Sequence, residues 1–314
     1  MKGYVRFFTF ILIISVVMTQ FGIVCHAADS EAENSAAAQD IVVKSAELTD
    51  YDKYLTDNNG ELYNGEPITT DLESFTADRG KELVVSSYAN VDKALILDSS
   101  VGTVEWEFTI PATAFYEISL DYIAVSGSES RIETSILLNG SIPYDSAEIV
   151  SLPRLWKNAK EIAEDSDGND IAPAQIQVEE LQTVSLSDLN GLYLQPLRFY
   201  LQEGSNKIAL RVLSGKFALS RINLKSIADS VSYKEYYDSL KNEKIYDGED
   251  IIIQGQDASF KSSKELRPIS DKSDPANTPS SAFNTKINCI GGNNWDSSGE
   301  RITWEFSVPK SALY

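Results

Sequence analysis

Apolar and polar residues alternate with a period of two along several short stretches of the chain. In residues 103–110 every second side chain is apolar, from Val104 to Ile110, and the side chains between them are Thr or Glu. Residues 118–124, 197–201 and 208–212 alternate in the same way. Successive side chains of a β-strand point to opposite faces, so this pattern predicts half-buried strands.

Turn signals separate these strands, and no long helical pattern lies between them. Asn139-Gly140 follows the apolar residues 136–138 and is a strong hairpin signal, because both residues tolerate positive φ. Many short strands without a long helix are typical of a β-sandwich. We therefore expect an all-β protein with a β-sandwich fold.

One segment of this pattern occurs twice. The Trp, Glu, Phe, Pro, Ala and Tyr residues of segment 106–116 return in the same order in segment 304–314. The lead-in Tyr51-Asp52-Lys53-Tyr54 likewise has a counterpart in Tyr233-Lys234-Glu235-Tyr236. Such self-similarity predicts two copies of one unit. We expect a complete sandwich over residues 45–229 and a second, truncated one over residues 230–314, with Trp106 and Trp304 in the two cores.

The N-terminal residues resemble a secretory signal. Lys2 and Arg6 precede an apolar run over residues 7–24, and Ala27-Ala28 offers small residues for cleavage. We assign residues 1–27 to a signal peptide and residues 28–44, which are polar and without periodicity, to a disordered linker. The protein is then secreted or held at the extracellular face of the envelope. An uncleaved membrane anchor and a lipidated Cys25 are the alternatives.

Charge and residue usage exclude several functions. Acidic residues outnumber basic ones by 47 to 27, for a formal net charge of −20, and no basic stripe is available for nucleic acid. The one histidine, His26, lies in the predicted signal, so the exported chain has no histidine for a catalytic triad or a metal site. Without that signal Cys289 has no partner for a disulfide. We expect a binding protein that is not an enzyme and has no organic cofactor.

Residues 151–195 show little alternation and carry the candidate sugar site. Trp156 offers an aromatic face for a pyranose ring, and Lys157 and Asn158 offer donors for its hydroxyl groups. The alternative is that Trp156 simply packs this long loop onto the sandwich. In the second copy, Trp295 lies in a polar Gly- and Asn-rich loop and is a further candidate platform, with packing again as the alternative.

Four oxygen-bearing side chains follow the Trp156 segment and are candidates for calcium, namely Asp165, Asp167, Asn169 and Asp170. Their spacing does not match an EF-hand loop, which requires Gly at its sixth position and Glu at its twelfth. The run Asp165-Ser166-Asp167-Gly168 is also typical of an ordinary turn.

Two resemblances rest on these residues. The Trp106 strand with Pro111 and Tyr116, followed later by the Gly204-Ser205-Asn206 turn and a final strand, resembles the galactose-binding-like jelly roll of many carbohydrate-binding modules. Segments 154–158 and 167–175 resemble the N-terminal region of large extracellular solute-binding proteins that serve carbohydrate ABC importers in Gram-positive bacteria. This second likeness covers about residues 45–314.

The resemblance implies a non-catalytic, exported region that assists the capture of an unidentified carbohydrate. It also implies an ABC-transporter permease as partner, contacted through a C-terminal domain that this chain does not include. The related sugar-binding modules usually carry Asn and Asp on their last strand, where this chain has Ala218 and Ser220. Two alternatives stay open, namely carbohydrate-binding modules of a secreted glycoside hydrolase and a surface adhesion or spacer module without a small ligand.

Overall fold

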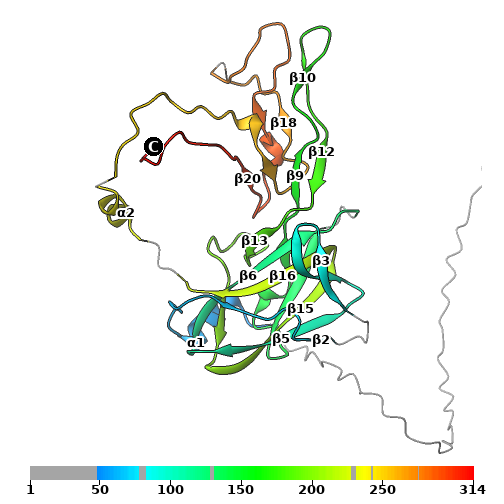
Figure 1. Ribbon diagram of the computed structural model, residues 1–314, viewed down its shortest axis with the longest axis vertical. Helices are drawn as coiled ribbons and strands as arrows, with labels where there is room; N and C mark the ends of the chain where they lie inside the picture. The colour runs from blue at the N-terminus through cyan, green and yellow to red at the C-terminus, as the bar shows by residue number, and fades with distance from the viewer. Residues whose placement is uncertain (1–47, 78–82, 128–130, 228–230, 242, 275) are drawn as a thin grey trace, which may run out of the picture. The chain divides into compact units, whose positions relative to one another are not determined.

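The computed structural model describes residues 48–77, 83–127, 131–227, 231–241, 243–274 and 276–314 (Figure 1). The predicted signal peptide, the predicted linker and the predicted boundary near residue 229 lie outside these residues. Among the described residues, no helix is long and apolar enough to cross a lipid bilayer.

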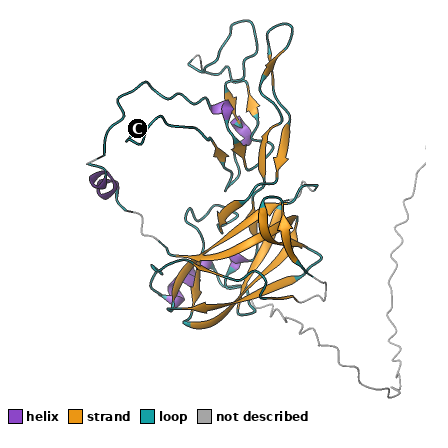
Figure 2. Ribbon diagram, in the orientation of Figure 1, coloured by secondary structure: helices purple, strands orange, loops and turns teal. Residues whose placement is uncertain are grey.

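Two antiparallel sheets form the first copy, which spans residues 51–227 (Figure 2). In the first sheet the strand order is β13-β6-β16-β4-β3, and β1 and β14 pair with β16 and β6. Its strands are β1 (Ile68–Thr69), β3 (Val85–Tyr88), β4 (Val91–Asp98), β6 (Ala114–Ala124), β13 (Gln182–Ser185), β14 (Arg198–Leu201) and β16 (Lys216–Lys225).

In the second sheet the strand order is β2-β5-β15-β7-β8. Its strands are β2 (Phe75–Ala77), β5 (Thr103–Ile110), β7 (Ile132–Leu138), β8 (Val150–Leu152) and β15 (Gly204–Ser214). The 3-10 helix η1 (Asp145–Ala147) leads into β8. Neighbouring strands in both sheets are often far apart in sequence, as is usual in a jelly roll. The predicted jelly-roll β-sandwich is confirmed.

Large aromatic side chains fill the space between the sheets. The Trp106 ring is fully buried, and its Nε1 donates to the Leu72 carbonyl at 3.4 Å. Tyr122 and Phe217 meet edge to face with ring centroids 5.9 Å apart. Apolar burial of this kind is the main favourable term in folding. The period-two alternation of β5 therefore places its Trp in the core, as predicted.

The second copy, described over residues 231–314, begins with the same local structure as the first. Helix α1 (Tyr51–Asn58) has its counterpart in α2 (Tyr233–Ser239). Tyr63 stacks on Tyr116 with ring centroids 4.4 Å apart, and Tyr246 stacks on Tyr314 at the same separation. The hydroxyl groups of Tyr116 and Tyr314 donate to Ala112 and Lys310 carbonyls, both at 2.7 Å. The sequence repeat is thus a repeat of contacts.

The repeated residues differ in burial, and the prediction of a buried Trp304 is wrong. Trp304 is partly exposed although its Nε1 donates to the Gly255 carbonyl at 3.2 Å. Phe108 is 2% exposed, whereas its counterpart Phe306 is 59% exposed. In the first copy β5 pairs along its whole length with β15. Among the described strands β20 (Ile302–Thr303) pairs only with β17 (Phe260–Lys261), so no second sheet covers Trp304.

The remaining short elements of the second copy are η2 (Gly255–Asp257), η3 (Gly292–Asn294) and the pair β18 (Pro268–Ile269) and β19 (Cys289–Ile290). Cys289 is a free, half-buried thiol on β19.

Replacing the two equivalent tryptophans should therefore have unequal effects. Trp106→Ala should lower the free energy of unfolding by about 3–5 kcal/mol, since it leaves a large cavity. Trp304→Ala should cost less than about 2 kcal/mol, because less of that ring leaves water on folding. Urea unfolding followed by circular dichroism measures both. Equal losses would contradict the assignment of Trp106 alone to a closed core.

Candidate functional site

The stretch expected to be irregular contains a β-hairpin, which we call the arm (residues 155–178). Strand β9 (Leu155–Asn158) pairs antiparallel with β12 (Gln175–Val178), and β10 (Ala163–Glu164) pairs with β11 (Asp170–Ile171) near the tip. Strand β9 reads Leu-Trp-Lys-Asn without alternation, β12 has only four residues, and β10 and β11 have two each, so the segment carries no sustained period of two. This is why the alternation missed these strands.

The arm joins the two copies in one sheet. Strand β9 pairs with β17 of the second copy at Trp156 and Lys261, and the full strand order is β12-β9-β17-β20. Trp156 is only 9% exposed at this junction. Its packing role, the alternative considered from the sequence, is therefore present in the structure.

Asn158 and Lys157 are half-buried on the same strand as Trp156. The Asn158 Oδ1 accepts from Lys261 Nζ at 2.8 Å and from Gln175 Nε2 at 2.9 Å. The side-chain oxygen of Asn158 thus already accepts hydrogen bonds from two protein donors. Sugar binding by Lys157 and Asn158 stays a prediction.

The Lys261 side chain is only 1% exposed in this sheet, and its Nζ donates to the neutral side-chain amide of Asn158. Burial disfavours the ammonium form and lowers the pKa of Lys261 to about 8. The joint between the copies therefore contains a desolvated cation.

The candidate calcium residues lie at the tip of the arm and have protein partners. Asp165 Oδ1 accepts from the backbone N–H groups of Asp167 and Asn169 at 2.9 and 2.8 Å. These backbone hydrogen bonds, that of Asn169 first, lower the pKa of the Asp165 carboxyl. The side chain of Asp165 thus stabilises the turn at the tip of the arm through hydrogen bonds to the backbone of that turn.

The other two of these side chains turn toward the second copy. Asp170 accepts from the Ile287 N–H at 2.8 Å and from Lys286 Nζ at 3.0 Å. Asn169 Oδ1 accepts from the Thr285 N–H at 2.9 Å. The described part of the chain contains no group of three or more His, Cys, Asp or Glu placed to hold a metal ion. Calcium binding by these residues stays a prediction, and their visible role is to fasten the arm.

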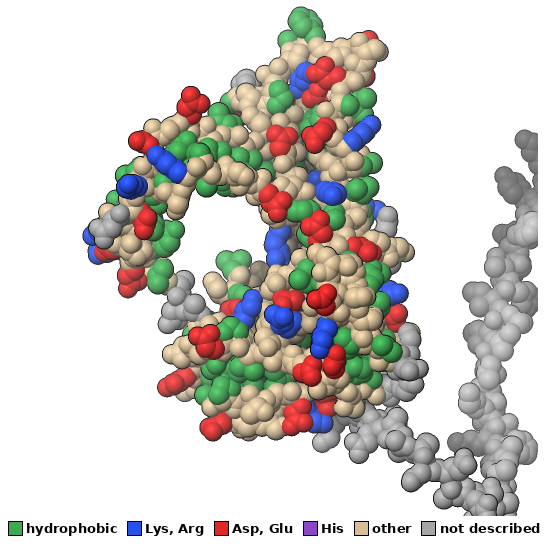
Figure 3. All heavy atoms as spheres, in the orientation of Figure 1, with side chains coloured by type: hydrophobic (Ala, Val, Ile, Leu, Met, Phe, Trp, Pro, Cys, Tyr) green, Lys and Arg blue, Asp and Glu red, His purple; other side chains and the backbone are tan. Residues whose placement is uncertain are grey.

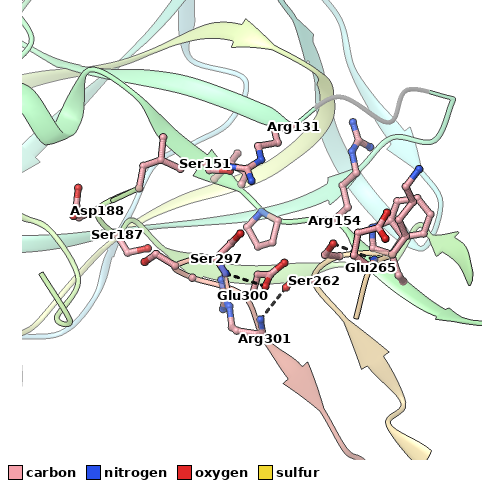
Figure 4. A pocket seen from close by; sticks show the side chains of 18 residues that line it. Arg131, Ser151, Arg154, Ser187, Asp188, Ser262, Glu265, Ser297, Glu300 and Arg301 are labelled. Atoms are coloured by element: carbon pink, nitrogen blue, oxygen red, sulfur yellow. Dashed lines mark hydrogen bonds between the residues drawn. The ribbon is translucent and has the colours of Figure 1, made fainter. Parts of the chain in front are cut away.

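A cavity of about 240 Å³ lies beside the base of the arm (Figure 4). The first copy contributes the start of β7, the segment between β8 and β9, and residues 187–189. The second copy contributes residues 262–265 and 297–301. Trp156 is part of the wall and Trp295 is not. Trp295 follows η3, is 49% exposed, and stays a separate candidate platform.

Several cavity residues are fixed by hydrogen bonds. Arg154 is buried, and its Nη1 donates to the Val125 carbonyl at 2.8 Å and to Gln177 Oε1 at 3.2 Å. Burial lowers the pKa of the Arg154 guanidinium below its usual value. On the opposite side, the Arg301 N–H donates to Ser262 Oγ at 2.8 Å, as drawn in Figure 4. The two copies thus each supply an ordered wall.

Asp188 is one of the residues of this site that the sequence did not indicate. It is 4% exposed, and its Oδ2 accepts from the Leu192 N–H at 2.7 Å. Its Oδ1 is buried without a hydrogen-bond partner among the described residues. Buried polar atoms are nearly always paired, and no described protein group donates to this oxygen, so it is an acceptor with capacity for a further hydrogen bond. Among 47 acidic residues, nothing in the sequence distinguishes this one.

Ala218 and Ser220 stand where the sequence departs from the sugar-binding modules that it resembles. Ala218 is fully buried in a small apolar cluster with Ala94, Ile123 and Val125. Ser220 lies at a β-bulge where the register between β16 and β6 shifts. Neither side chain is among the residues that line the cavity.

No family model and no curated protein sequence matches the chain. Among solved structures, a family 35 carbohydrate binding module from Clostridium thermocellum is similar, with 12% identity over 52% of this chain and 100% of that chain, at a TM-score of 0.27. The CBM22-1 xylan-binding domain from Paenibacillus barcinonensis shows 10% identity over 55% and 99%, also at 0.27.

A Podospora anserina GH26-CBM35 β-(1,4)-mannanase shows 14% identity over 58% of this chain and 30% of that chain, at a TM-score of 0.27. At these TM-scores the fold assignment depends on the strand order of the chain itself.

The buried ammonium at the joint makes the stability depend on pH. The pKa of Lys261 is about 8 in the folded protein and near 10.5 when unfolded, so the unfolded state binds more protons between these values. The free-energy cost of burying the Lys261 ammonium is fully present below the folded pKa, and it is lost as the pH rises toward 10.5. Raising the pH from about 7 to about 9 should relieve about 1 kcal/mol of it.

Lys261→Met is the matched variant, because it keeps the length of the side chain and removes the charge. It should be more stable near neutral pH and should lose this part of the pH dependence. Urea unfolding of both proteins at the two pH values measures the difference. A pH dependence that is identical in the variant would contradict the assignment to Lys261.

Proposed function

We propose that residues 45–314 form an exported, non-catalytic region that captures extracellular carbohydrate for an ABC importer. The observation that carries the proposal is the cavity at the base of the arm, with the unpaired Asp188 Oδ1 in its wall. The signal-like N-terminus and the resemblance of segments 154–158 and 167–175 to solute-binding proteins support the cellular context.

The chemistry of the wall suits a ligand with many hydroxyl groups. Such a ligand needs closely spaced donors and acceptors together with an apolar surface for its ring. Serine hydroxyls line both walls, and Asp188 supplies an acceptor that has no donor of its own. Leu152, Pro153 and Trp156 supply apolar surface. A sugar hydroxyl beside Asp188 would meet a carboxylate, the strongest acceptor type in this wall.

The size of the cavity limits the ligand. Its volume of about 240 Å³ is below the roughly 300–1,000 Å³ of pockets for drug-sized ligands. About one or two sugar rings would occupy it, and the rest of a longer glycan would extend into solvent. The site thus suits the end of a chain or a short oligosaccharide.

The importer and a secreted hydrolase make different demands on the same binding region. If the region serves an importer, deleting the gene should abolish uptake of the captured sugar and leave extracellular hydrolysis of its polymer intact. Loss of hydrolysis with normal uptake of the free sugar would assign the region to a glycoside hydrolase instead. Retention of both would favour an adhesion or spacer module.

Asp188→Asn tests the cavity directly. The amide keeps an acceptor for the Leu192 N–H but replaces a charged acceptor by a neutral one toward the ligand. Affinity for a bound glycan should fall about tenfold, the difference between a charged and a neutral hydrogen bond. A glycan array identifies the glycan, and calorimetry on the exported chain measures the affinity.

Asp92→Asn is the matched control, because Asp92 is exposed on β4 and is not part of the cavity wall. Its affinity should equal that of the unmodified protein. Absence of glycan binding, or equal affinity in both variants, would contradict the proposed site.

A further inference from the structure

Cations are concentrated at the cavity against the charge balance of the whole chain. Of the 18 residues that line it, four are basic and three are acidic. The basic residues are Arg131, Arg154, Lys264 and Arg301, and the acidic ones are Asp188, Glu265 and Glu300. In the full sequence acidic residues prevail by 47 to 27. Figure 3 shows acidic and basic side chains interspersed over the face in view.

Two of the arginines face the hollow from different copies. In Figure 4 Arg131 and Arg301 lie on opposite sides of it, with Asp188 and Ser187 toward one end and Glu265 toward the other. Both are exposed, and neither has an ion pair with a carboxylate of the described residues. Arg154 differs, since its guanidinium is held by the Val125 carbonyl and Gln177.

The backbone fixes the position of both arginines. The Arg131 carbonyl accepts from Ser214 Oγ at 2.6 Å, and Arg131 leads directly into β7. The Arg301 carbonyl accepts from the Ser262 N–H at 2.9 Å, while its own N–H donates to Ser262 Oγ. Burial raises the pKa of the Tyr122 hydroxyl, and the charges of Arg301 and Arg154 act against that rise. Arg301 therefore lies near enough to the buried Tyr122 hydroxyl for its charge to influence the pKa of that group.

We propose that the ligand is a pyranose that carries an oxyanion, a carboxylate or a phosphate, held between Arg131 of the first copy and Arg301 of the second. The planar guanidinium offers parallel donors that match the oxygens of such groups. The hydroxyls of the same sugar would then meet Asp188 and the serines. This inference rests on the proposed function and adds the chemical class of the ligand.

Electrostatics favours an anion over a neutral sugar here. Two like charges on opposite sides of a small cavity repel each other, and an anion between them removes the repulsion and adds two attractions. A net charge of −20 repels anionic polymers at long range, so capture requires local cations. Salt screens exposed charges, so binding of an anionic ligand should weaken as the salt concentration rises.

The experiment compares four probes on the full exported chain by calorimetry or ligand-observed NMR. D-glucuronate and glucose 6-phosphate carry the oxyanion, D-glucose is the neutral analogue, and inorganic phosphate lacks the sugar. At least one of the two acidic sugars should bind about tenfold or more tightly than D-glucose and than phosphate alone. Which of them binds distinguishes the carboxylate from the phosphoryl group.

Arg131→Gln and Arg301→Gln should each weaken binding of the acidic sugar about tenfold, with little effect on any binding of D-glucose. Arg221→Gln is the matched control, because Arg221 is exposed on β16 and outside the cavity wall, and it should bind normally. An unchanged circular dichroism spectrum excludes misfolding as the cause of a loss.

Failure of this inference is distinguishable from failure of the proposed function. Equal binding of D-glucose and the acidic sugars, unaffected by either arginine variant, would overturn the oxyanion and leave a carbohydrate site. Binding of phosphate as tightly as the phosphosugar would also overturn it, since the sugar would then contribute nothing. No binding of any of these sugars, or of any glycan on the array, would overturn both.

Discussion

The pairing of β9 with β17 is the constraint on which the candidate site depends. Through this contact the arm of the first copy and the short strands of the second become one sheet. The segments around residues 188 and 300 lie far apart in sequence and line one cavity only when the copies are joined here. Contacts at the tip of the arm, above all those of Asp170 with residues 286 and 287, join the arm to the second copy at a second place.

This joint differs in chemistry from the core of the sandwich. The core is filled by aromatic and aliphatic side chains, and its stability comes from apolar area removed from water. The joint instead buries a lysine against an amide, and an ion pair between Lys286 and Asp170 lies at the tip of the arm. Burying a charge costs free energy unless it is well paired, so the buried lysine lowers the stability that this contact contributes. A joint of this kind can respond to pH or to a ligand that bridges the two copies.

The repeat shows how far local sequence carries structure. The stacked tyrosines and the indole hydrogen bonds form alike in both copies, because they depend on residues within the repeated segments and their lead-ins. Burial is not local. Phe108 and Phe306 share the same sequence context but differ from 2% to 59% in exposure, since only the first has β15 across from it.

The sequence by itself determined the β class, the strands with a period of two, the repeat and the expectation of a binding protein. These follow from alternation and residue usage, which are properties of neighbours along the chain. It identified Trp156 as a residue of interest but did not indicate Asp188, Arg131 or Arg301, and it missed the arm as a hairpin. Only the tertiary structure decided those, because a cavity wall is assembled from segments whose proximity comes from strand pairing across the two copies, which no local pattern encodes.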